Sequence, residues 1–359
     1  MAKRKSYIFM EDQRSHWLRK TLLTLLFLLL ALALGLFAVS YGISHDVTLE
    51  RVTVTVPDLP ADLEQWSILL MSDLHGATLG RQQSGIRRAI EGVNMSVIVF
   101  MGDMVGPGGD IQPLLDIVSF LPKDKIILYV PGDEDFDYLD GTAHANITAK
   151  ADWALALEQA GVTIVDVPVL FTRGANNRSR IWFIPEYLYS LDCDNLERMY
   201  QAQLDALNAK ASLTSDEVAM RRVAEYEIAR AQKIRLAKSE IRKGDIQVAL
   251  SHVPVTQSYM DSLILWGDRN TEFSLLKADL ILAGHYCGGQ WRVPGRGAIY
   301  VPQLGFWPED RLIRGLDYIG AVPQYISPGL GASGIYPYFR FRVMNQPVVT
   351  YLTLTSRQQ

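Results

Sequence analysis

The sequence predicts an α/β domain attached to a single N-terminal membrane-spanning helix. Three observations carry this prediction. Residues 21–44 contain no charged side chain. Further along, short apolar stretches alternate with amphipathic ones, which is typical of buried, mostly parallel strands separated by helices. Motifs rich in Asp and His follow several of the apolar stretches directly, at the strand ends where α/β sheets usually bind ligands.

The membrane-spanning prediction rests on length and uniformity. Residues 22–37 are almost continuously Leu, Ala and Phe, and about 21 helical residues rise ~31 Å, the thickness of the hydrocarbon core of a bilayer. A cleavable signal peptide is the alternative, but its apolar core is usually only about 7–15 residues long. We expect a cytoplasmic tail at 1–20, a signal anchor at 21–44 and one large domain at 47–359.

Basic residues flank the apolar segment unequally. Only Arg51 follows it closely, whereas six basic residues precede it: Lys3, Arg4, Lys5, Arg14, Arg19 and Lys20. Because the more basic flank normally stays in the cytoplasm, the large domain is expected outside it, on a single-pass cell-membrane protein. The net charge of −4 argues against a general nucleic-acid-binding protein, which would be basic.

The expected elements follow one another as in an α/β sheet. Helices are expected at 82–93 and 111–120, and strands at 47–56, 66–71, 96–101, 125–130, 162–171, 180–184, 246–250, 280–283 and 339–354. Residues 195–243 contain no Pro or Gly and are strongly helical, and Gly244 would end this insertion. We expect a helical hairpin packed beside the core. A lid or a partner-binding arm is the alternative.

Five motifs supply side chains that commonly bind metal ions. In chain order they are Ser72-Asp73-Leu74-His75, Gly102-Asp103, Pro131-Gly132-Asp133-Glu134-Asp135, Ser251-His252 and Gly284-His285-Tyr286-Cys287-Gly288-Gly289-Gln290. Carboxylates, imidazoles and thiolates are the usual protein ligands of transition-metal ions. A lone Asp-x-His would mean little, but five ordered motifs, each after an expected strand, indicate a site for two neighbouring ions.

These residues resemble the motifs of the calcineurin-like metallophosphoesterases, in particular their small membrane-anchored bacterial phosphodiesterases. Members of that family carry Asp-x-His, Gly-Asp, Gly-Asn-His-Asp/Glu, a lone His and Gly-His-x-His-Gly-Gly-Gln in this order. The resemblance extends from about residue 66 to 351, except for the helical insertion. It implies a four-layer α/β/β/α sandwich and two divalent or mixed-valence metal ions, with Mn, Zn and Fe as candidates.

The resemblance also assigns four residues of this chain to each ion. The first set is Asp73, His75, Asp103 and Cys287, and the second is Asp103, Asp133, His252 and His285. In this arrangement Asp103 bridges the two ions. They hold a hydroxide between them and stabilise the charge that develops on the phosphate during in-line displacement.

Three residues depart from the family's pattern. Asp133 replaces an Asn ligand, Glu134 replaces a His near the leaving group, and Cys287 replaces the last His. Two additional negative charges would reduce how strongly the ions polarise water. Asp133 is expected to bind metal or to cap its own loop. Glu134 is expected to act as a catalytic acid, with a hydrogen bond to a metal ligand or no role as the alternatives. Cys287 would bind metal or form a disulfide with Cys193.

The expected function is a membrane-anchored metal-dependent phosphohydrolase. Its substrate would be a phosphodiester or a pyrophosphate, with lipid-linked phosphoesters among the candidates. The alternative, suggested by Asp133, Glu134 and Cys287, is a catalytically weak or inactive relative that binds a metal or a phosphorylated ligand and acts through protein partners.

Overall fold

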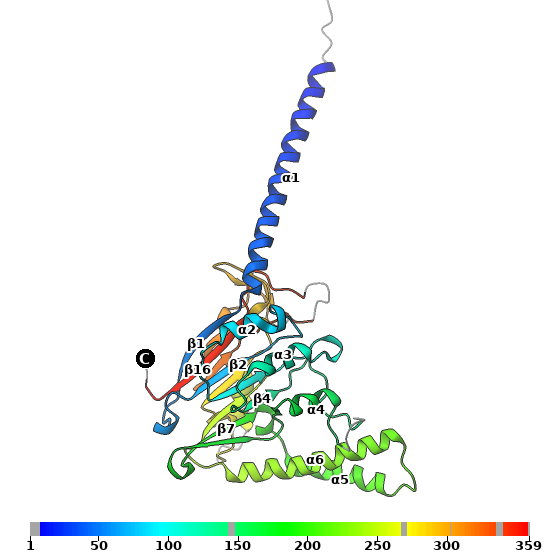
Figure 1. Ribbon diagram of the computed structural model, residues 1–359, viewed down its shortest axis with the longest axis vertical. Helices are drawn as coiled ribbons and strands as arrows, with labels where there is room; N and C mark the ends of the chain where they lie inside the picture. The colour runs from blue at the N-terminus through cyan, green and yellow to red at the C-terminus, as the bar shows by residue number, and fades with distance from the viewer. Residues whose placement is uncertain (1–7, 143–147, 267–270, 302, 335–339, 358–359) are drawn as a thin grey trace, which may run out of the picture.

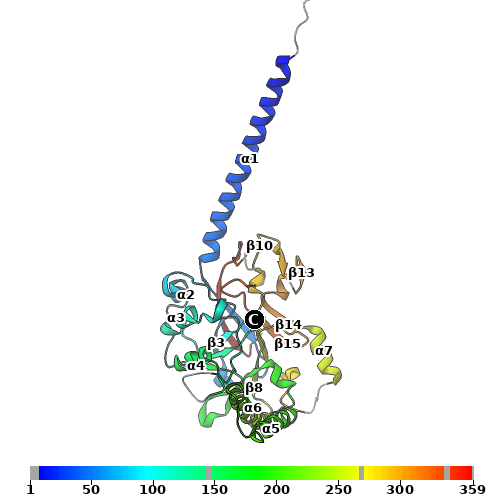
Figure 2. The ribbon, with the colours of Figure 1, turned by 90° about the vertical axis from the view of Figure 1, so that its right-hand side faces the viewer.

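The computed structural model describes residues 8–142, 148–266, 271–301, 303–334 and 340–357. A long helix, α1 (Ile8–His45), projects from one end of an α/β domain (Figures 1 and 2). Residues 16–45 of this helix are long and apolar enough to cross a membrane. Ser40 and Ser44, near its C-terminal end, are buried against the domain.

The first sheet contains both the first and the last strand of the domain. Its order is β1 (Thr48–Thr55), β16 (Val348–Thr355), β2 (Ser67–Met71), β3 (Val97–Met101), β4 (Ile127–Val130) and β5 (Val162–Ile164). Strands β2 to β5 are parallel. Strand β16 is parallel to β1 and antiparallel to β2.

The second sheet has the order β14 (Gly315–Ile319), β15 (Val322–Ile326), β9 (Leu280–Ala283), β8 (Ile246–Leu250), β7 (Ser179–Pro185) and β6 (Val169–Arg173). Its four central strands are parallel. Strands β14 and β6 pair with their neighbours in the antiparallel direction. This mixture confirms the predicted α/β class, with parallel strands at the centre of each sheet.

Alternating side chains along the strands explain the layers. Ile68 and Leu70 of β2 belong to a cluster that also contains Phe183 and Val248 of the second sheet. Leu69 and Met71 point the other way, into a cluster with residues of helices α2 (Ser84–Ala89), α3 (Gln112–Phe120) and α4 (Asp152–Gln159). A strand buried on both faces needs apolar residues along its length, as β2 has from Ile68 to Met71. The sandwich is therefore α/β/β/α, as predicted.

The predicted helical insertion forms a hairpin of α5 (Cys193–Asn208) and α6 (Ser215–Glu240) against the outer face of the second sheet. Helix α6 begins with a capping box, in which Thr214 and Glu217 satisfy each other's backbone N–H groups. Ala231 and Ile234 of α6 pack against Trp182 of β7. Helix α7 (Gln257–Trp266) covers another part of this face.

Two small hairpins lie at the end of the domain nearest to α1 (Figure 2). One pairs β10 (Arg292–Val293) with β11 (Gly297–Ala298), and the other pairs β12 (Tyr300–Val301) with β13 (Gly305–Phe306). Neither was predicted from the sequence.

Three predicted elements were wrong in extent. The strand expected at 162–171 is split between β5 and β6, which lie in different sheets because the chain crosses between them after the buried Asp166. The helix expected at 82–93 ends at Ala89. Of the strand expected at 339–354, residue 339 lies outside the described residues and only β16 forms. Before β16, Val343 forms only an isolated bridge with Trp291, and the Arg342 side chain donates to backbone carbonyls of a neighbouring loop.

Candidate metal centre

The predicted motifs converge because strands of both sheets end at the same place. The first sheet delivers three motifs just after β2, β3 and β4, and the second delivers two just after β8 and β9. Parallel strands present their carboxyl ends at one edge of a sheet. Five pairs of strand and site residue follow this pattern: β2 and Asp73, β3 and Asp103, β4 and Asp133, β8 and His252, β9 and His285.

One cluster of donors, called here the His252 group, consists of Asp103, Asp133, His252 and His285. Their ligand atoms all lie within 4.8 Å of one another. His252 Nε2 is 3.1 Å from Asp103 Oδ2 and 3.0 Å from Asp133 Oδ1. His285 Nδ1 is 3.0 Å from the same Asp133 oxygen. This is the complete second set implied by the resemblance.

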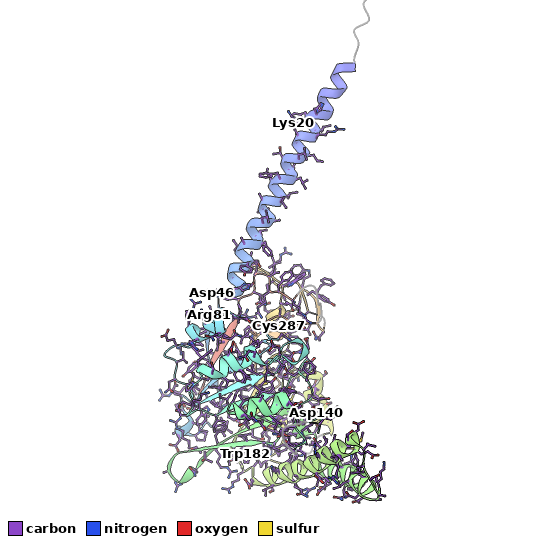
Figure 3. All side chains as sticks on the ribbon, turned by 45° about the vertical axis from the view of Figure 1, so that its right-hand side comes forward. Lys20, Asp46, Arg81, Asp140, Trp182 and Cys287 are labelled. Carbon is purple, nitrogen blue, oxygen red and sulfur yellow. The ribbon has the colours of Figure 1, made fainter. Side chains whose placement is uncertain are left out.

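A second cluster, called here the Cys287 group, consists of Asp73, His75 and Cys287, which also lie within 4.8 Å of one another. Cys287 Sγ is 3.5 Å from His75 Nε2, and that nitrogen is 3.8 Å from Asp103 Oδ2. Asp103 therefore stands between the two groups, in the position of a bridging ligand. Cys287 lies on the α1 side of the domain (Figure 3).

The donor atoms fit cations better than they fit one another. Asp73 Oδ1 is buried without a hydrogen-bond partner, while Ser72 donates to the other oxygen of this carboxylate. His252 Nε2 is buried close to two carboxylates but is aligned for a hydrogen bond to neither. Buried polar atoms without a hydrogen-bond partner are costly in a folded protein. A divalent cation would satisfy them with its preferred ligands.

The electrostatics of the site point the same way. Burial alone would lower the pKa of His252, yet the carboxylates of Asp103 and Asp133 hold it well above the ordinary range. Burial and the nearby Asp73 raise the pKa of the Cys287 thiol far above its usual value. The protein by itself thus keeps this thiol protonated, and only a bound cation would favour the thiolate that ligates metal.

Each of the three imidazoles is oriented through its other ring nitrogen. His252 Nδ1 lies 2.7 Å from the backbone oxygen of Met101. His285 Nε2 lies 2.9 Å from the side-chain nitrogen of Gln303. His75 Nδ1 lies 3.4 Å from Glu134 Oε2. Such contacts fix the ring direction of metal-binding histidines.

Asp135 organises the backbone around the bridging position. Its Oδ2 accepts hydrogen bonds from Asp103 N at 2.8 Å, Gly132 N at 2.8 Å and Tyr129 Oη at 2.6 Å, and its Oδ1 accepts from Val105 N at 3.0 Å. One buried carboxylate therefore ties the loops after β3 and β4 together.

The backbone of the site is strained. Five site residues adopt a positive φ that L-residues other than Gly rarely adopt: Asp73, His75, Asp103, His285 and Cys287. The loops are also tightly apposed, because a Cβ on Gly132 would lie 2.1 Å from Asp103 Oδ1 and one on Gly102 would lie 2.3 Å from His252 Nδ1. A set of unfavourable conformations at one place is typical of a functional site.

Glu134 lies at the edge of the site and is held by a distant loop. Its Oε1 accepts from Ser333 Oγ at 2.5 Å, and its Oε2 accepts from Gly334 N at 3.1 Å. Its own backbone N–H donates to Asp103 Oδ1 at 2.9 Å. The side chain thus faces His75 and the 333–334 turn as a hydrogen-bond acceptor.

The two cysteines do not pair. Both are free thiols, since Cys193 packs on α5 against the second sheet whereas Cys287 belongs to the donor cluster. The alternative of a disulfide between them is therefore not supported.

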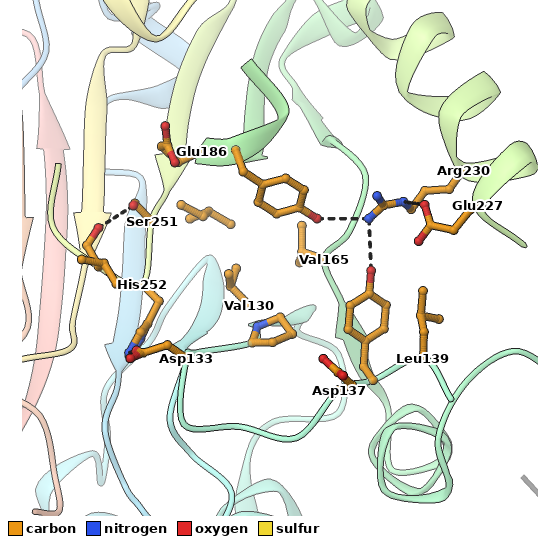
Figure 4. A pocket seen from close by; sticks show the side chains of 15 residues that line it. Val130, Asp133, Asp137, Leu139, Val165, Glu186, Glu227, Arg230, Ser251 and His252 are labelled. Atoms are coloured by element: carbon orange, nitrogen blue, oxygen red, sulfur yellow. Dashed lines mark hydrogen bonds and ion pairs between the residues drawn. The ribbon is translucent and has the colours of Figure 1, made fainter. Parts of the chain in front are cut away.

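A cavity of about 540 Å³ extends from the His252 group toward the helical insertion (Figure 4). At its far end Arg230 of α6 donates to Tyr138 Oη at 3.1 Å and to Tyr187 Oη at 3.3 Å. Arg230 also forms a buried ion pair with Glu227 at 3.0 Å. The insertion therefore contributes to the wall of the cavity beside the metal-binding side chains, which no sequence signal predicted.

Other residues of the site were also missed. Asn345 donates to the backbone oxygen of Cys287 at 2.9 Å and Arg342 donates to that of Pro328 at 3.0 Å, so the C-terminal segment positions the last motif. Together with Gln303, Ser333 and Gly334, these residues lie outside every recognised motif. Neither spacing nor residue type distinguishes them from surface polar residues.

Comparisons with known proteins agree with the geometry. Residues 67–288 match the family model described as calcineurin-like phosphoesterase, whereas no curated protein matches the chain. A solved structure of a phosphopantetheinyl hydrolase from Mycobacterium tuberculosis is similar at 14% identity and a TM-score of 0.33, covering 75% of this chain and 91% of that chain. The family model spans more than half of the 359 residues of this chain. The chain therefore belongs to the calcineurin-like phosphoesterases and is a metal-dependent phosphoester hydrolase.

Proposed function

We propose that this chain is a membrane-anchored phosphohydrolase whose centre binds two divalent or mixed-valence ions of Mn, Zn or Fe. The observation that carries the proposal is the position of Asp103. This carboxylate belongs to the His252 group and also lies 3.8 Å from His75 of the Cys287 group. One ion would be held by Asp73, His75, Asp103 and Cys287, and the other by Asp103, Asp133, His252 and His285.

Two ions at these positions would supply Lewis acidity and the bridged hydroxide of the family mechanism. The contacts around the site also favour one role for Asp133 over the other that the sequence left open. Asp133 is favoured as a ligand rather than a loop cap, because His252 and His285 both face its Oδ1 and hold its pKa well below the usual range.

The contacts of Glu134 support a positioning role in preference to the catalytic acid expected from its sequence position. Both carboxylate oxygens accept hydrogen bonds, from Ser333 and Gly334. These two donors fix the carboxylate beside His75, which favours an orienting role. Glu134 would instead keep His75 turned toward the Cys287 group through the 3.4 Å contact with Nδ1.

The anchor is proposed to be the part of α1 at residues 21–44, followed by the catalytic domain at 47–359. Helix α1 has the length and apolar character that this role needs. The basic residues Arg19 and Lys20 precede the apolar part of the helix, and Lys3, Arg4 and Lys5 lie outside the described residues. This charge distribution supports an extracytoplasmic catalytic domain.

The substrate is proposed to be a phosphodiester or a pyrophosphate. The cavity in Figure 4 begins at Asp133 and His252, so it would receive the part of the substrate attached to the phosphate. Its tyrosine hydroxyls and apolar side chains suit an organic group with oxygen acceptors.

The test is metal analysis of the full-length chain purified in detergent, combined with hydrolysis of an aryl phosphodiester in the presence of Mn, Zn or Fe. Two ions per chain and turnover are expected. Asp103→Asn should abolish turnover and reduce the metal content, whereas Asp124→Asn, whose side chain is 72% exposed at the opposite end of β4, should change neither. A single bound ion, or full activity of Asp103→Asn, would contradict the bridging role.

A further inference from the structure

An apolar surface is exposed on the β12–β13 hairpin. Leu304, Phe306 and Trp307, called here the hairpin face, are 37%, 73% and 51% exposed. Single exposed apolar side chains are ordinary, but here three of them, two of which are aromatic, fall within four successive positions. The ring of Phe306 lies 4.7 Å from that of Tyr300, and Phe306 nevertheless stays largely exposed.

The β12–β13 hairpin, which carries these residues, lies at the end of the domain where α1 joins it, with β10 between α1 and β13 in Figure 2. The final turns of α1 are docked there, since Ser44 Oγ donates to Arg342 O at 3.0 Å and Ser40 Oγ accepts from Met344 N at 3.0 Å. Because the apolar part of α1 ends at these residues, the surface of a bilayer spanned by α1 would run past this end of the domain.

A cleft of about 610 Å³ opens at the same end. Trp307 and Met344 line it, together with Arg296 in the β10–β11 turn. Arg296 is exposed and makes no ion pair among the described residues. Arg292, Glu309 and Asp310 line the same cleft. A cleft that combines an aromatic side chain with charged groups suits the headgroup layer of a membrane, where apolar and polar groups meet.

The hairpin is also connected to the metal centre. Gln303, next to Leu304, contacts His285 Nε2 at 2.9 Å. The segment that receives α1 contains Asn345, which donates to the backbone oxygen of Cys287. Side chains of the hairpin and of the segment that receives α1 therefore each contact a ligand of one donor group, which links this end of the domain to the metal centre.

We propose that the hairpin face inserts into the lipid headgroup layer beside α1, and that the substrate is a phosphoester carried by a membrane lipid. The lipid would reach the metal centre along the hairpin without leaving the bilayer surface. This inference rests on the proposed anchored phosphohydrolase and names the class of its substrate.

The position of the hairpin face can be tested in nanodiscs that hold one full-length chain each. Phe306→Cys is labelled with an environment-sensitive dye, and Leu236→Cys on α6, at the far end of the domain and 61% exposed, serves as the matched control. The native cysteines are buried and should label slowly. Spin-labelled lipids are expected to quench the dye at 306 and not at 236. Equal quenching at both positions, or a blue shift at 306 without lipid quenching, which would indicate a protein partner, overturns the proposal.

The substrate class is tested with two esters that share the same reacting bond. One is hexadecyl p-nitrophenyl phosphate embedded in nanodiscs, and the other is water-soluble methyl p-nitrophenyl phosphate. The double variant Phe306→Ser, Trp307→Ser should raise KM for the embedded ester by about tenfold or more, since each buried apolar side chain contributes to interfacial binding. Its kcat/KM for the soluble ester should stay within about twofold of the original, as should both values for Leu236→Ser.

These outcomes separate the inference from the function on which it rests. Equal loss on both esters would mean that the hairpin acts only by supporting His285, and would refute the lipid proposal while leaving the hydrolase intact. No turnover of either ester by the unmodified chain would refute the hydrolase, whereas lipid quenching at position 306 would still place the hairpin in the membrane.

Discussion

Replacing Asp135 by Asn should destabilise the domain because this carboxylate receives four hydrogen bonds. Three of its four donors belong to the buried residues Asp103, Val105 and Tyr129. Asn provides one acceptor oxygen and one NH₂ group. If the oxygen takes the place of Oδ2, the NH₂ group faces the N–H of Val105, so that two donors meet at about the 3.0 Å of the present contact.

The size of the effect follows from these contacts. Three bonds lose a charged acceptor, at roughly 1 kcal/mol each, and one buried donor is left unpaired, at about 1–3 kcal/mol. Burial of the carboxylate partly offsets this destabilisation. Burial raises the pKa of Asp135 despite the hydrogen bonds, which means that the charged form is unfavourable at this position. The neutral amide of Asn avoids that cost and so recovers part of the lost stability. A net destabilisation of about 2–3 kcal/mol should lower the melting temperature of a domain of this size by roughly 3–5 °C.

The assay is thermal unfolding of the full-length chain in detergent with a chelator present, so that metal binding does not contribute. Asp137→Asn is the matched control, because Asp137 is exposed and its carboxylate makes no hydrogen bond among the described residues. A melting temperature of Asp135→Asn within about 1 °C of the control would refute the view that this carboxylate holds the two loops together.

Three further predictions concern other parts of the structure. Glu134→Gln should weaken metal binding by about 10–100-fold in chelator competition, whereas unchanged affinity with lost turnover would restore the catalytic-acid role. Arg230→Met should destabilise the chain by about 3–5 kcal/mol in denaturant unfolding, and adding Glu227→Met should recover most of this, because the buried partner is no longer left charged and unpaired; no recovery would contradict the pairing. Burial raises the pKa of Asp279 from 3.8 to about 6, so its ionisation reduces stability as pH rises from about 4 to 6. Asp279→Asn should therefore raise the melting temperature at pH 8 and much less at pH 4, and an equal effect at both would argue against this.

The parts of the fold that could be predicted are those where local pattern and global position agree. Apart from Ser67 at the start of β2, strands β2, β3 and β4 are continuous apolar runs, since both faces of each strand are buried. The polar residues that follow each run mark the carboxyl end of the strand, where the chain leaves the buried sheet. The Asp and His residues that follow were therefore recognisable as neighbours, and the structure brings them together.

Elements whose position depends on distant parts of the chain could not be predicted. The apolar alternation at 162–171 contains no information about which sheet each half joins. The contact between Ser333 and Glu134 joins residues 199 positions apart, and Gln303 resembles any polar loop residue until the fold places it beside His285. These residues became visible only through tertiary contacts.

The pairing of β1 with β16 has a consequence for biosynthesis. In its sheet, the strand that follows α1 pairs only with β16, which lies 300 positions further along the chain. All residues as far as β16 must therefore be synthesised before that sheet can close, and until then β2 presents a bare edge to its surroundings. During synthesis this edge would be a natural place for a chaperone to bind.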